Sequence, residues 1–222
     1  VLENGMTILV REDSSSQVSS VQLWVNTGSI HEGPLLGAGV SHYLEHMLFK
    51  GTEKRSGKQI SREVQSLGGC INAYTTFDRT VYYIDLPSEN TIGAIDILAD
   101  AGFNSTLPEE EVEKERQVIL REIDMGKDDP DHLLGRAVFE TAYRVHPYKY
   151  PVIGYKDIFE TVTRDELMDY YKSRYVPNNM VLVITGDVNA EEIFKSSSEI
   201  LEVFPRQRLE SLYIPEEPKA LS

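Results

Sequence analysis

The first part of the chain alternates apolar and polar side chains in the manner of β structure. The alternation runs through residues 6–10 and again through residues 21–25, with a polar cluster at residues 13–16 between them. A period of two is typical of strands with one buried face, and such a cluster is typical of a turn. The pattern therefore predicts a hairpin formed by these two strands.

Further along the chain, the spacing of apolar side chains changes from the period of strands to the period of helices. Residues 40–49 repeat apolar positions with a helical period, and Gly51 follows at a C-cap position. A second helix is expected from Ser56, a good N-cap residue, to the glycine pair at 68–69. A longer helix is expected over residues 108–126, because proline opens it and three glutamates lie near its positive end.

The other expected elements complete an irregular alternation of strands and helices, which favours an α+β fold with helices on one face of a sheet. Capping boxes are expected at residues 163–166 and 189–192, on either side of a buried strand. The other expected strands and helices are an antiparallel hairpin of strands 71–77 and 80–86, helices over 92–103 and 130–143, and the strand 180–185.

Composition narrows the class of protein. The chain has 222 residues, of which 41% are hydrophobic, as in an ordinary globular protein. Its 22 Lys and Arg against 36 Asp and Glu give a net charge of −14, which would repel nucleic acid and anionic lipid. We therefore expect no nucleic-acid partner, and a basic partner is the better expectation.

The single cysteine, Cys70, excludes an intrachain disulfide and a cysteine-based zinc site, and we expect it to be a buried small residue. No apolar run approaches the roughly 20 residues of a membrane span, so a soluble protein is expected. The chain begins at Val1 and runs almost directly into a strand, so we expect the true N-terminus to be missing. The compartment stays unknown: cytoplasmic or periplasmic in a bacterium, mitochondrial in a eukaryote.

The helix at residues 40–49 carries an unusual polar face. On a helical wheel Glu45 lies about 60° to one side of His42 and His46 about 40° to the other, opposite the apolar side chains. Histidines at i and i+4 stand about 6 Å apart along the axis and can reach one cation. The sequence H-x-x-E-H is the inverse of the commoner H-E-x-x-H zinc motif. The alternative is a pair of solvated histidines on a helix surface.

A third metal ligand must come from elsewhere, because catalytic zinc usually has three protein ligands and an open position. Glu115 and Glu122 lie inside the apolar stripe of the long helix, where carboxylates are costly unless a cation receives them. They are about 10.5 Å apart along the axis, so one should bind the metal and the other orient a ligand. The alternative is a salt bridge to Arg116, Arg121 or another basic group.

Four stretches together resemble the pitrilysin-like (inverzincin) zinc metallopeptidases, the family of insulin-degrading enzymes and the mitochondrial processing peptidase β subunit. They are GAGVSHYLEHMLFKGT, GGCINAYTTFDRTVYY, EKERQVILREI and RYVPNNMVLVITGDV. The resemblance implies an α+β fold with a mixed, mostly antiparallel sheet packed against helices. It also implies a zinc endopeptidase with one Zn²⁺ per active site.

Roles for individual residues follow from the same resemblance. His42, His46 and Glu122 would hold the zinc, with Glu122 in the place of the family's distal ligand. Glu45 would be the general base and Glu115 the supporting carboxylate. A peptide substrate would pair with an edge strand through Asn72, Ala73 and Tyr74.

The family usually adds a second, homologous domain that closes a chamber over the substrate. We therefore expect residues 1–213 to be the catalytic domain and residues 214–222, rich in Pro and Glu, to begin a linker. Full activity would need that second domain or a partner subunit, and a homodimer is a further arrangement. Rival functions are a non-catalytic core or assembly subunit and a zinc hydrolase of small molecules. His31, His132 and His146 have no partner at ligand spacing and are expected to be ordinary surface or core histidines.

Overall fold

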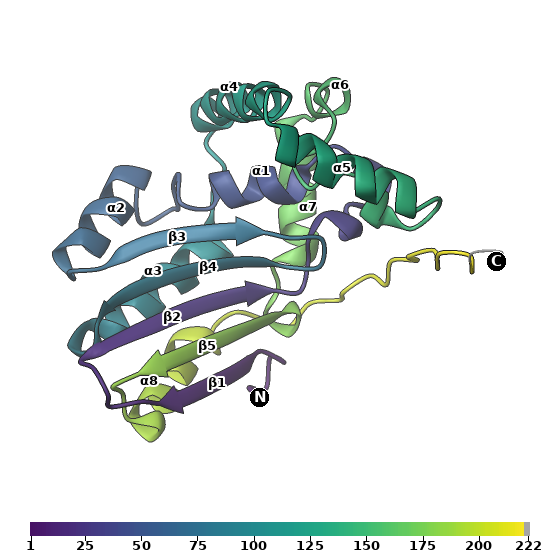
Figure 1. Ribbon diagram of the computed structural model, residues 1–222. Helices are drawn as coiled ribbons and strands as arrows, with labels where there is room; N and C mark the ends of the chain where they lie inside the picture. Colours follow the sequence, from purple (N-terminus) through teal and green to yellow (C-terminus); the bar gives the residue numbers. More distant parts are fainter. Residues whose placement is uncertain (220–222) are drawn as a thin grey trace.

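A five-stranded mixed sheet forms the centre of the molecule in the computed structural model, which describes residues 1–219 (Figure 1). The strand order is β1-β5-β2-β4-β3, so β3 lies at one edge. β1 runs parallel to β5, and every other neighbouring pair is antiparallel. The expected α+β fold with a mixed, mostly antiparallel sheet is confirmed. The strands are β1 (Thr7–Glu12), β2 (Val18–Val25), β3 (Cys70–Thr75), β4 (Thr80–Pro87) and β5 (Met180–Gly186).

The hairpin expected from the first two strands was wrong. β5 lies between them, with Thr7 beside Val181 in a parallel pair and Val25 opposite Met180 in an antiparallel one. Residues 13–16 do form a connection between β1 and β2, but it spans the width of β5 instead of making a tight turn. By contrast, β3 and β4 form the expected antiparallel hairpin.

The helices begin close to their capping signals. Ser56 and Gln59 form a reciprocal capping box at the second helix, and Thr163 and Glu166 form another. Asn189 accepts from the Glu192 backbone N–H, which is half of the predicted box. The helices of eight or more residues are α1 (Val40–Met47), α2 (Gly57–Ser66), α3 (Thr91–Asn104), α4 (Glu109–Gly126), α5 (Pro130–Ala142), α7 (Arg164–Arg174) and α8 (Ala190–Leu201), and α6 (Lys156–Phe159) is a single turn.

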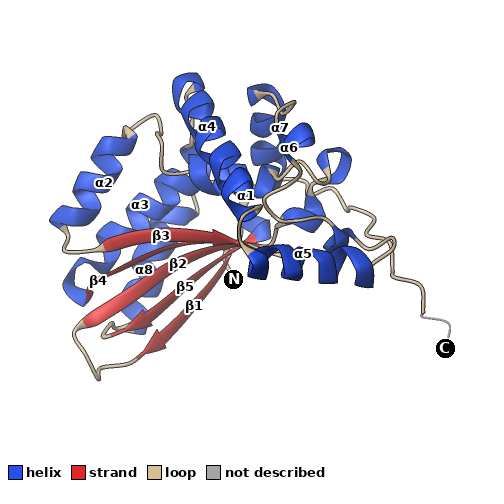
Figure 2. Cartoon of the chain, turned by 45° about the horizontal axis from the view of Figure 1, so that its top comes forward, coloured by secondary structure: helices blue, strands red, loops and turns tan. Residues whose placement is uncertain are grey.

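One face of the sheet carries the core. Along β2 the side chains alternate, so that Leu23 is fully buried against α3 while Gln22 is only partly buried on the other face. Ile84 of β4 and Leu98 of α3 complete this packing and are also fully buried. α3 covers β2 and β4, and α8 covers β1, on the same side (Figure 2). The expectation of helices on one face is consistent with this arrangement.

The edge strand β3 alternates in exposure along its length. Cys70, expected to be buried, is exposed, because it shares the outward face with Asn72 and Tyr74. Ile71 and Ala73 lie on the inward face and are partly covered. The strand therefore offers α1 one set of side chains and leaves the other toward solvent.

The last described residues run along the surface without helix or strand. The Glu217 carboxylate accepts hydrogen bonds from the backbone N–H groups of residues 144–146 at 2.9–3.0 Å, which fixes this segment beside the end of α5. Residues 220–222 of the predicted linker lie outside the described residues. Within residues 1–219, no helix combines the length and apolar character needed to cross a membrane.

Candidate metal site

Helix α1 separates its core face from its polar face. Tyr43, Leu44 and Met47 are fully buried, whereas His42 and His46 are only partly buried on the opposite face. The ring centroids of the two histidines lie 4.7 Å apart. The apolar face thus fixes the helix against the body of the molecule and leaves both imidazoles free to share a ligand.

The start of α1 is held by a buried carboxylate that no sequence pattern singled out. Glu32 is 2% exposed and accepts backbone N–H groups of Gly39 at 3.1 Å and Ser41 at 3.0 Å. Burial raises the pKa of Glu32 to about 8, while these donors act to lower it. Gly39 has φ +71°, and a Cβ there would lie 2.2 Å from the Ile153 carbonyl oxygen, so only glycine fits. The position of His42 depends on this junction.

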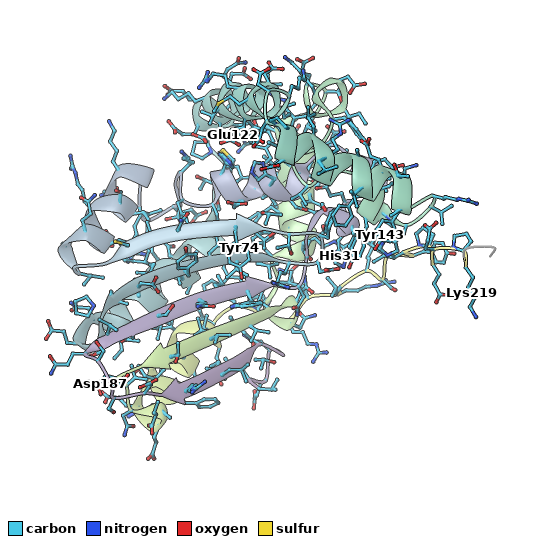
Figure 3. All side chains as sticks on the ribbon, viewed as in Figure 1. His31, Tyr74, Glu122, Tyr143, Asp187 and Lys219 are labelled. Atoms are coloured by element: carbon cyan, nitrogen blue, oxygen red, sulfur yellow. The ribbon has the colours of Figure 1, made fainter. Side chains whose placement is uncertain are left out.

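Helix α4 brings Glu122 to the two histidines. The Glu122 Oε2 atom lies 3.6 Å from His46 Nε2 and 3.9 Å from His42 Nε2, and Figure 3 places Glu122 between α4 and α1. One ligand atom from each residue lies within 4.8 Å of the other two. Ligand atoms bound tetrahedrally at about 2.0–2.2 Å from zinc are roughly 3.3–3.6 Å apart, so only a small closure would be needed. Two imidazoles and a carboxylate are a donor set that suits zinc.

Glu115 lies nearer the start of α4 and contacts the other ring nitrogen of His46. Its Oε2 is 3.0 Å from His46 Nδ1, and its Oε1 accepts from Lys50 Nζ at 2.6 Å. Burial acts to raise the pKa of Glu115, but the hydrogen bonds from Lys50 and His46 bring it below its ordinary value. A carboxylate at Nδ1 directs the Nε2 lone pair of His46 away from it, toward Glu122.

Glu45 faces the same space from α1. The Thr75 hydroxyl at the end of β3 donates to Glu45 Oε2 at 2.6 Å. Burial raises the pKa of Glu45, and the Thr75 hydrogen bond offsets part of that rise. Burial also lowers the pKa of His42 to about 3, with a smaller contribution from His46, so His42 is neutral and able to bind a cation at pH 7.

Comparison with protein families shows which family the chain belongs to. The profile of the insulinase family, peptidase family M16, matches residues 7–156, which include both histidines and both α4 glutamates. The chain belongs to peptidase family M16. A second profile, the peptidase M16 inactive domain, matches residues 161–221.

Relatives of this M16 chain are known from bacteria and mitochondria. An uncharacterized zinc protease of Rickettsia bellii is 39% identical over 199 residues, 90% of this chain and 48% of the relative. The mitochondrial-processing peptidase β subunit of Neurospora crassa is 34% identical over 204 residues, 92% of this chain and 43% of that protein. A protease of Helicobacter pylori superposes with a TM-score of 0.93 at 28% identity, covering 99% of this chain and 53% of that structure. The M16 chain thus spans about half the length of the curated relatives it matches.

Two polar residues of the candidate site were given no role at the site from the sequence. Thr75 holds Glu45, and Lys50 holds Glu115. The alternation of β3 was the available signal for Thr75, since it shares the inward face with Ile71 and Ala73. Nothing in the local pattern distinguished Lys50 from an ordinary surface lysine, because its partner lies far away in the sequence.

The remaining predicted residues lie around the site. Asn72, Ala73 and Tyr74 stand on the edge strand that ends at Thr75, with Asn72 and Tyr74 exposed. The other histidines do not join the cluster: within residues 1–219, His42, His46 and Glu122 are the group of three whose ligand atoms converge. His31 instead accepts a hydrogen bond from the Gly28 backbone N–H at 3.1 Å.

Proposed function

We propose that this chain is the catalytic part of a zinc endopeptidase, with His42, His46 and Glu122 as metal ligands. The observation that carries the proposal is the convergence of their three ligand atoms within 4.8 Å at the polar face of α1. Several M16 relatives are named zinc proteases, which supports zinc as the metal. A bound zinc ion would polarise a scissile carbonyl and lower the pKa of a water molecule beside it.

Glu45 is the residue that moves the proton in this proposal. Glu45 is on the same face of α1 as the two histidines. The Thr75 hydroxyl donates to its Oε2 atom and so fixes the carboxylate, whose other oxygen can accept a proton from the attacking water. It then delivers that proton to the leaving amine nitrogen as the peptide bond breaks. A raised pKa suits both halves of this transfer, since it makes Glu45 a stronger base than an exposed carboxylate.

Two further elements, a carboxylate and a strand, would support the reaction. Glu115, fixed by Lys50, would orient His46 and strengthen it as a ligand. The edge position of β3 would let an extended peptide add to the sheet alongside Asn72, Ala73 and Tyr74, which would place its backbone next to Glu45.

The rest of the proposal concerns the whole protein. Residues 1–213 would form the catalytic domain and residues 214–222 the start of a linker. A second homologous domain, a partner subunit or a second copy of the chain would then close over the peptide. The relatives of about twice this length support such a complement.

Glu45→Gln tests the reaction directly. Turnover of an unfolded peptide should fall about 10²–10⁴-fold, while zinc content by metal analysis stays at the wild-type level, because an amide cannot carry the proton. Glu53→Gln, at an exposed carboxylate in the loop after α1, is the matched control and should keep full turnover. The assays use the protein at its full cellular length, with and without a chelator. A Glu45→Gln protein that keeps more than about a tenth of the wild-type rate would remove Glu45 from the mechanism.

A second candidate is a non-catalytic core or assembly subunit. The inactive-domain profile over residues 161–221 favours it to some degree, although that region contains none of the proposed ligands. The same measurements separate the two candidates. Wild-type protein that binds zinc but leaves every peptide intact would favour assembly over catalysis.

A further inference from the structure

Two cavities flank the metal site along the edge strand. The larger, about 780 Å³, adjoins residues 71–73 and is lined by Glu45 and His46. The smaller, about 420 Å³, adjoins Phe77 just past the end of β3 and has His42 in its wall. An extended peptide lying along β3 would therefore pass from one cavity to the other, across the polar face of α1. Cavities of this size can enclose a large side chain.

Aromatic rings form much of the smaller cavity. The Phe77 ring centroid lies 5.0 Å from that of Phe139 on α5 and 4.8 Å from that of Tyr148, and α5 lies across the end of β3 in Figures 1 and 2. Tilted rings at these separations present both faces and edges to a guest. The apolar lining residues are Phe77, Phe139, Tyr148, Tyr150, Pro151, Val152 and Ile153.

Both basic side chains and one hydroxyl group in the wall of this cavity already have partners within the protein. Arg136 Nε donates to Glu140 at 2.8 Å, and Lys149 Nζ donates to a backbone carbonyl oxygen at 3.3 Å. The Tyr148 hydroxyl donates to the Asp78 carboxylate at 3.0 Å. The larger cavity differs, since its wall includes a lysine of α2 and two glutamates of α4. The wall of the smaller cavity also includes Asp131 and His132, both exposed at the start of α5, and Asp131 would repel an acidic guest. The smaller cavity therefore offers a guest mainly its aromatic and aliphatic side chains.

The distance along the chain from Thr75 to Phe77 determines which substrate residue can reach the smaller cavity. Thr75 contacts Glu45 and so marks the level of the scissile bond, and Phe77 follows two residues later. Two residues of extended chain span about 7 Å. We propose that the cavity around Phe77 and Phe139 binds a large aromatic or aliphatic side chain of the peptide, two to three residues from the scissile bond. This inference rests on the proposed peptidase function, because it needs a peptide on β3.

The cavity can be filled without disturbing the fold. Gly135 of α5 lines it, and a Cβ added there would meet no atom within 4 Å. Gly135→Leu should therefore occupy the cavity while favouring the helix. Phe139→Ala changes the cavity in the opposite direction, by removing a wall. Val138→Ala is the matched control, because Val138 is exposed on the same helix and does not line the cavity.

The experiment compares peptides that differ only in one residue, Phe, Leu or Asp, at each of three positions on either side of the cleaved bond. Wild-type protein at full length should prefer Phe or Leu over Asp by about 10–200-fold in kcat/KM at one position two or three residues from that bond. Gly135→Leu and Phe139→Ala should each reduce that preference at least about fivefold, at that position alone. Val138→Ala should not change it.

Binding of the same peptides to zinc-loaded Glu45→Gln protein, measured by calorimetry, separates this inference from the proposed function. Cleavage with no apolar preference, or a preference that both cavity variants leave intact, would overturn the inference and leave the peptidase standing. An apolar preference in binding that the cavity variants abolish, without cleavage by the wild type, would keep the cavity and overturn the peptidase. Peptides that neither bind nor are cleaved would overturn both.

Discussion

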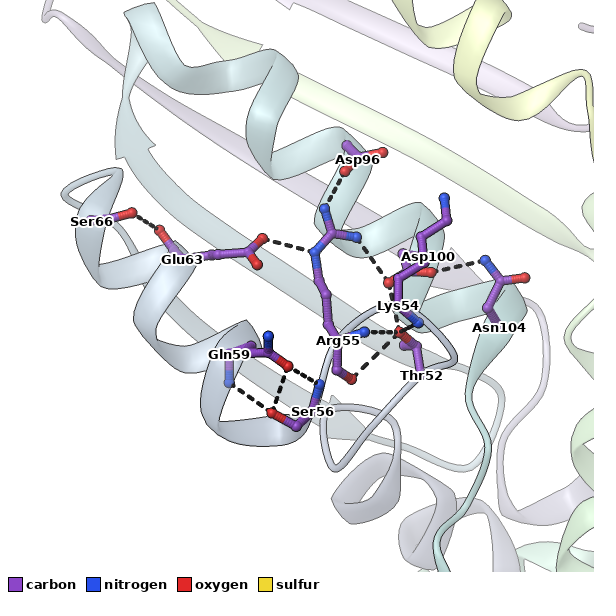
Figure 4. A network of polar contacts seen from close by, with 10 residues as sticks. All are labelled: Thr52, Lys54, Arg55, Ser56, Gln59, Glu63, Ser66, Asp96, Asp100 and Asn104. Carbon is purple, nitrogen blue, oxygen red and sulfur yellow. Dashed lines mark hydrogen bonds and ion pairs between the residues drawn. The ribbon is translucent and has the colours of Figure 1, made fainter.

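Two clusters of charged side chains in this molecule are built on opposite principles. Around Arg55, shown in Figure 4, each of the three guanidinium nitrogens donates to a carboxylate: Nε to Glu63 at 2.7 Å, Nη1 to Asp100 at 2.8 Å, and Nη2 to Asp96. At the candidate metal site, by contrast, Glu122 Oε2 lies 3.9 Å from His42 Nε2 and 3.6 Å from His46 Nε2. The first cluster contains its own cation, whereas the second would receive one from outside under the proposed function.

The difference concerns what each cluster does for the protein. The Arg55 network ties the loop after α1 to α2 and α3, and Asp100 within it is 3% exposed and also accepts from Thr52 and Asn104. Such a closed network contributes to folding and has little to offer a ligand. Converging acceptors contribute little to folding on their own and gain their stabilisation from a bound cation. Charge clusters can therefore be sorted by whether their partners are internal.

The largest predicted effect is on the closed network. Arg55→Met should lower the free energy of unfolding by about 3–5 kcal/mol, because it leaves the buried Asp100 without its cation. Zinc affinity of the folded protein should stay unchanged. Urea unfolding and zinc titration measure the two quantities, with Lys54→Met, at an exposed neighbour, as control. A parallel loss of zinc affinity would show that the two clusters are coupled.

Substitutions in the cluster of His42, His46 and Glu122 should change zinc affinity and leave the free energy of unfolding nearly unchanged. Glu122→Gln should weaken zinc binding more than about 100-fold, whereas Glu115→Gln, which reaches the metal only through His46, should weaken it about 10–100-fold. Unfolding of the metal-free protein should change little for Glu122→Gln. Competition with a chromophoric chelator gives the affinities. Equal losses for the two variants would mean that the ligand assignment is wrong.

The smallest effect, taken per pH unit, is a pH dependence of the stability of the metal-free protein. The pKa of His42 is about 3 in the folded state against an ordinary 6.5, so between these values the unfolded chain binds a proton that the folded chain does not. Stability should therefore fall as pH decreases through this window, by up to about 1.4 kcal/mol per pH unit from this group. His42→Gln should flatten that part of the urea-midpoint profile relative to wild type, and the exposed His132→Gln should not. An unchanged profile in His42→Gln would show that the pH dependence has another origin.

Local signals in the sequence predicted the helices well. Ser56 and Thr163 cap helices because the capping oxygen and its N–H partner lie within one helical turn of each other. The His42 and His46 pair is equally local. The distal carboxylates were assigned by resemblance and by their place in an apolar stripe, and α4 does bring both toward α1.

Long-range pairing could not be predicted in the same way. The insertion of β5 between β1 and β2 depends on which of several similar strands packs best, and alternation alone does not encode that choice. Cys70 was misjudged because residue type outweighed its place on the outward face of an edge strand. The Lys50 contact with Glu115 depends on how α1 and α4 cross, which only the folded structure defines.

The parallel pairing of β1 with β5 also has a consequence for the order in which the chain can fold. Thr7 lies beside Val181, so most of the chain separates the two partners in sequence. At about 5–20 residues per second, a ribosome needs roughly 9–35 s to synthesise the segment between them. β2, β4 and β3 can pair in that interval, since Trp24 needs only Val81. β1 is therefore synthesised before the other strands of the sheet and can pair only after β5, the last of them, has been synthesised.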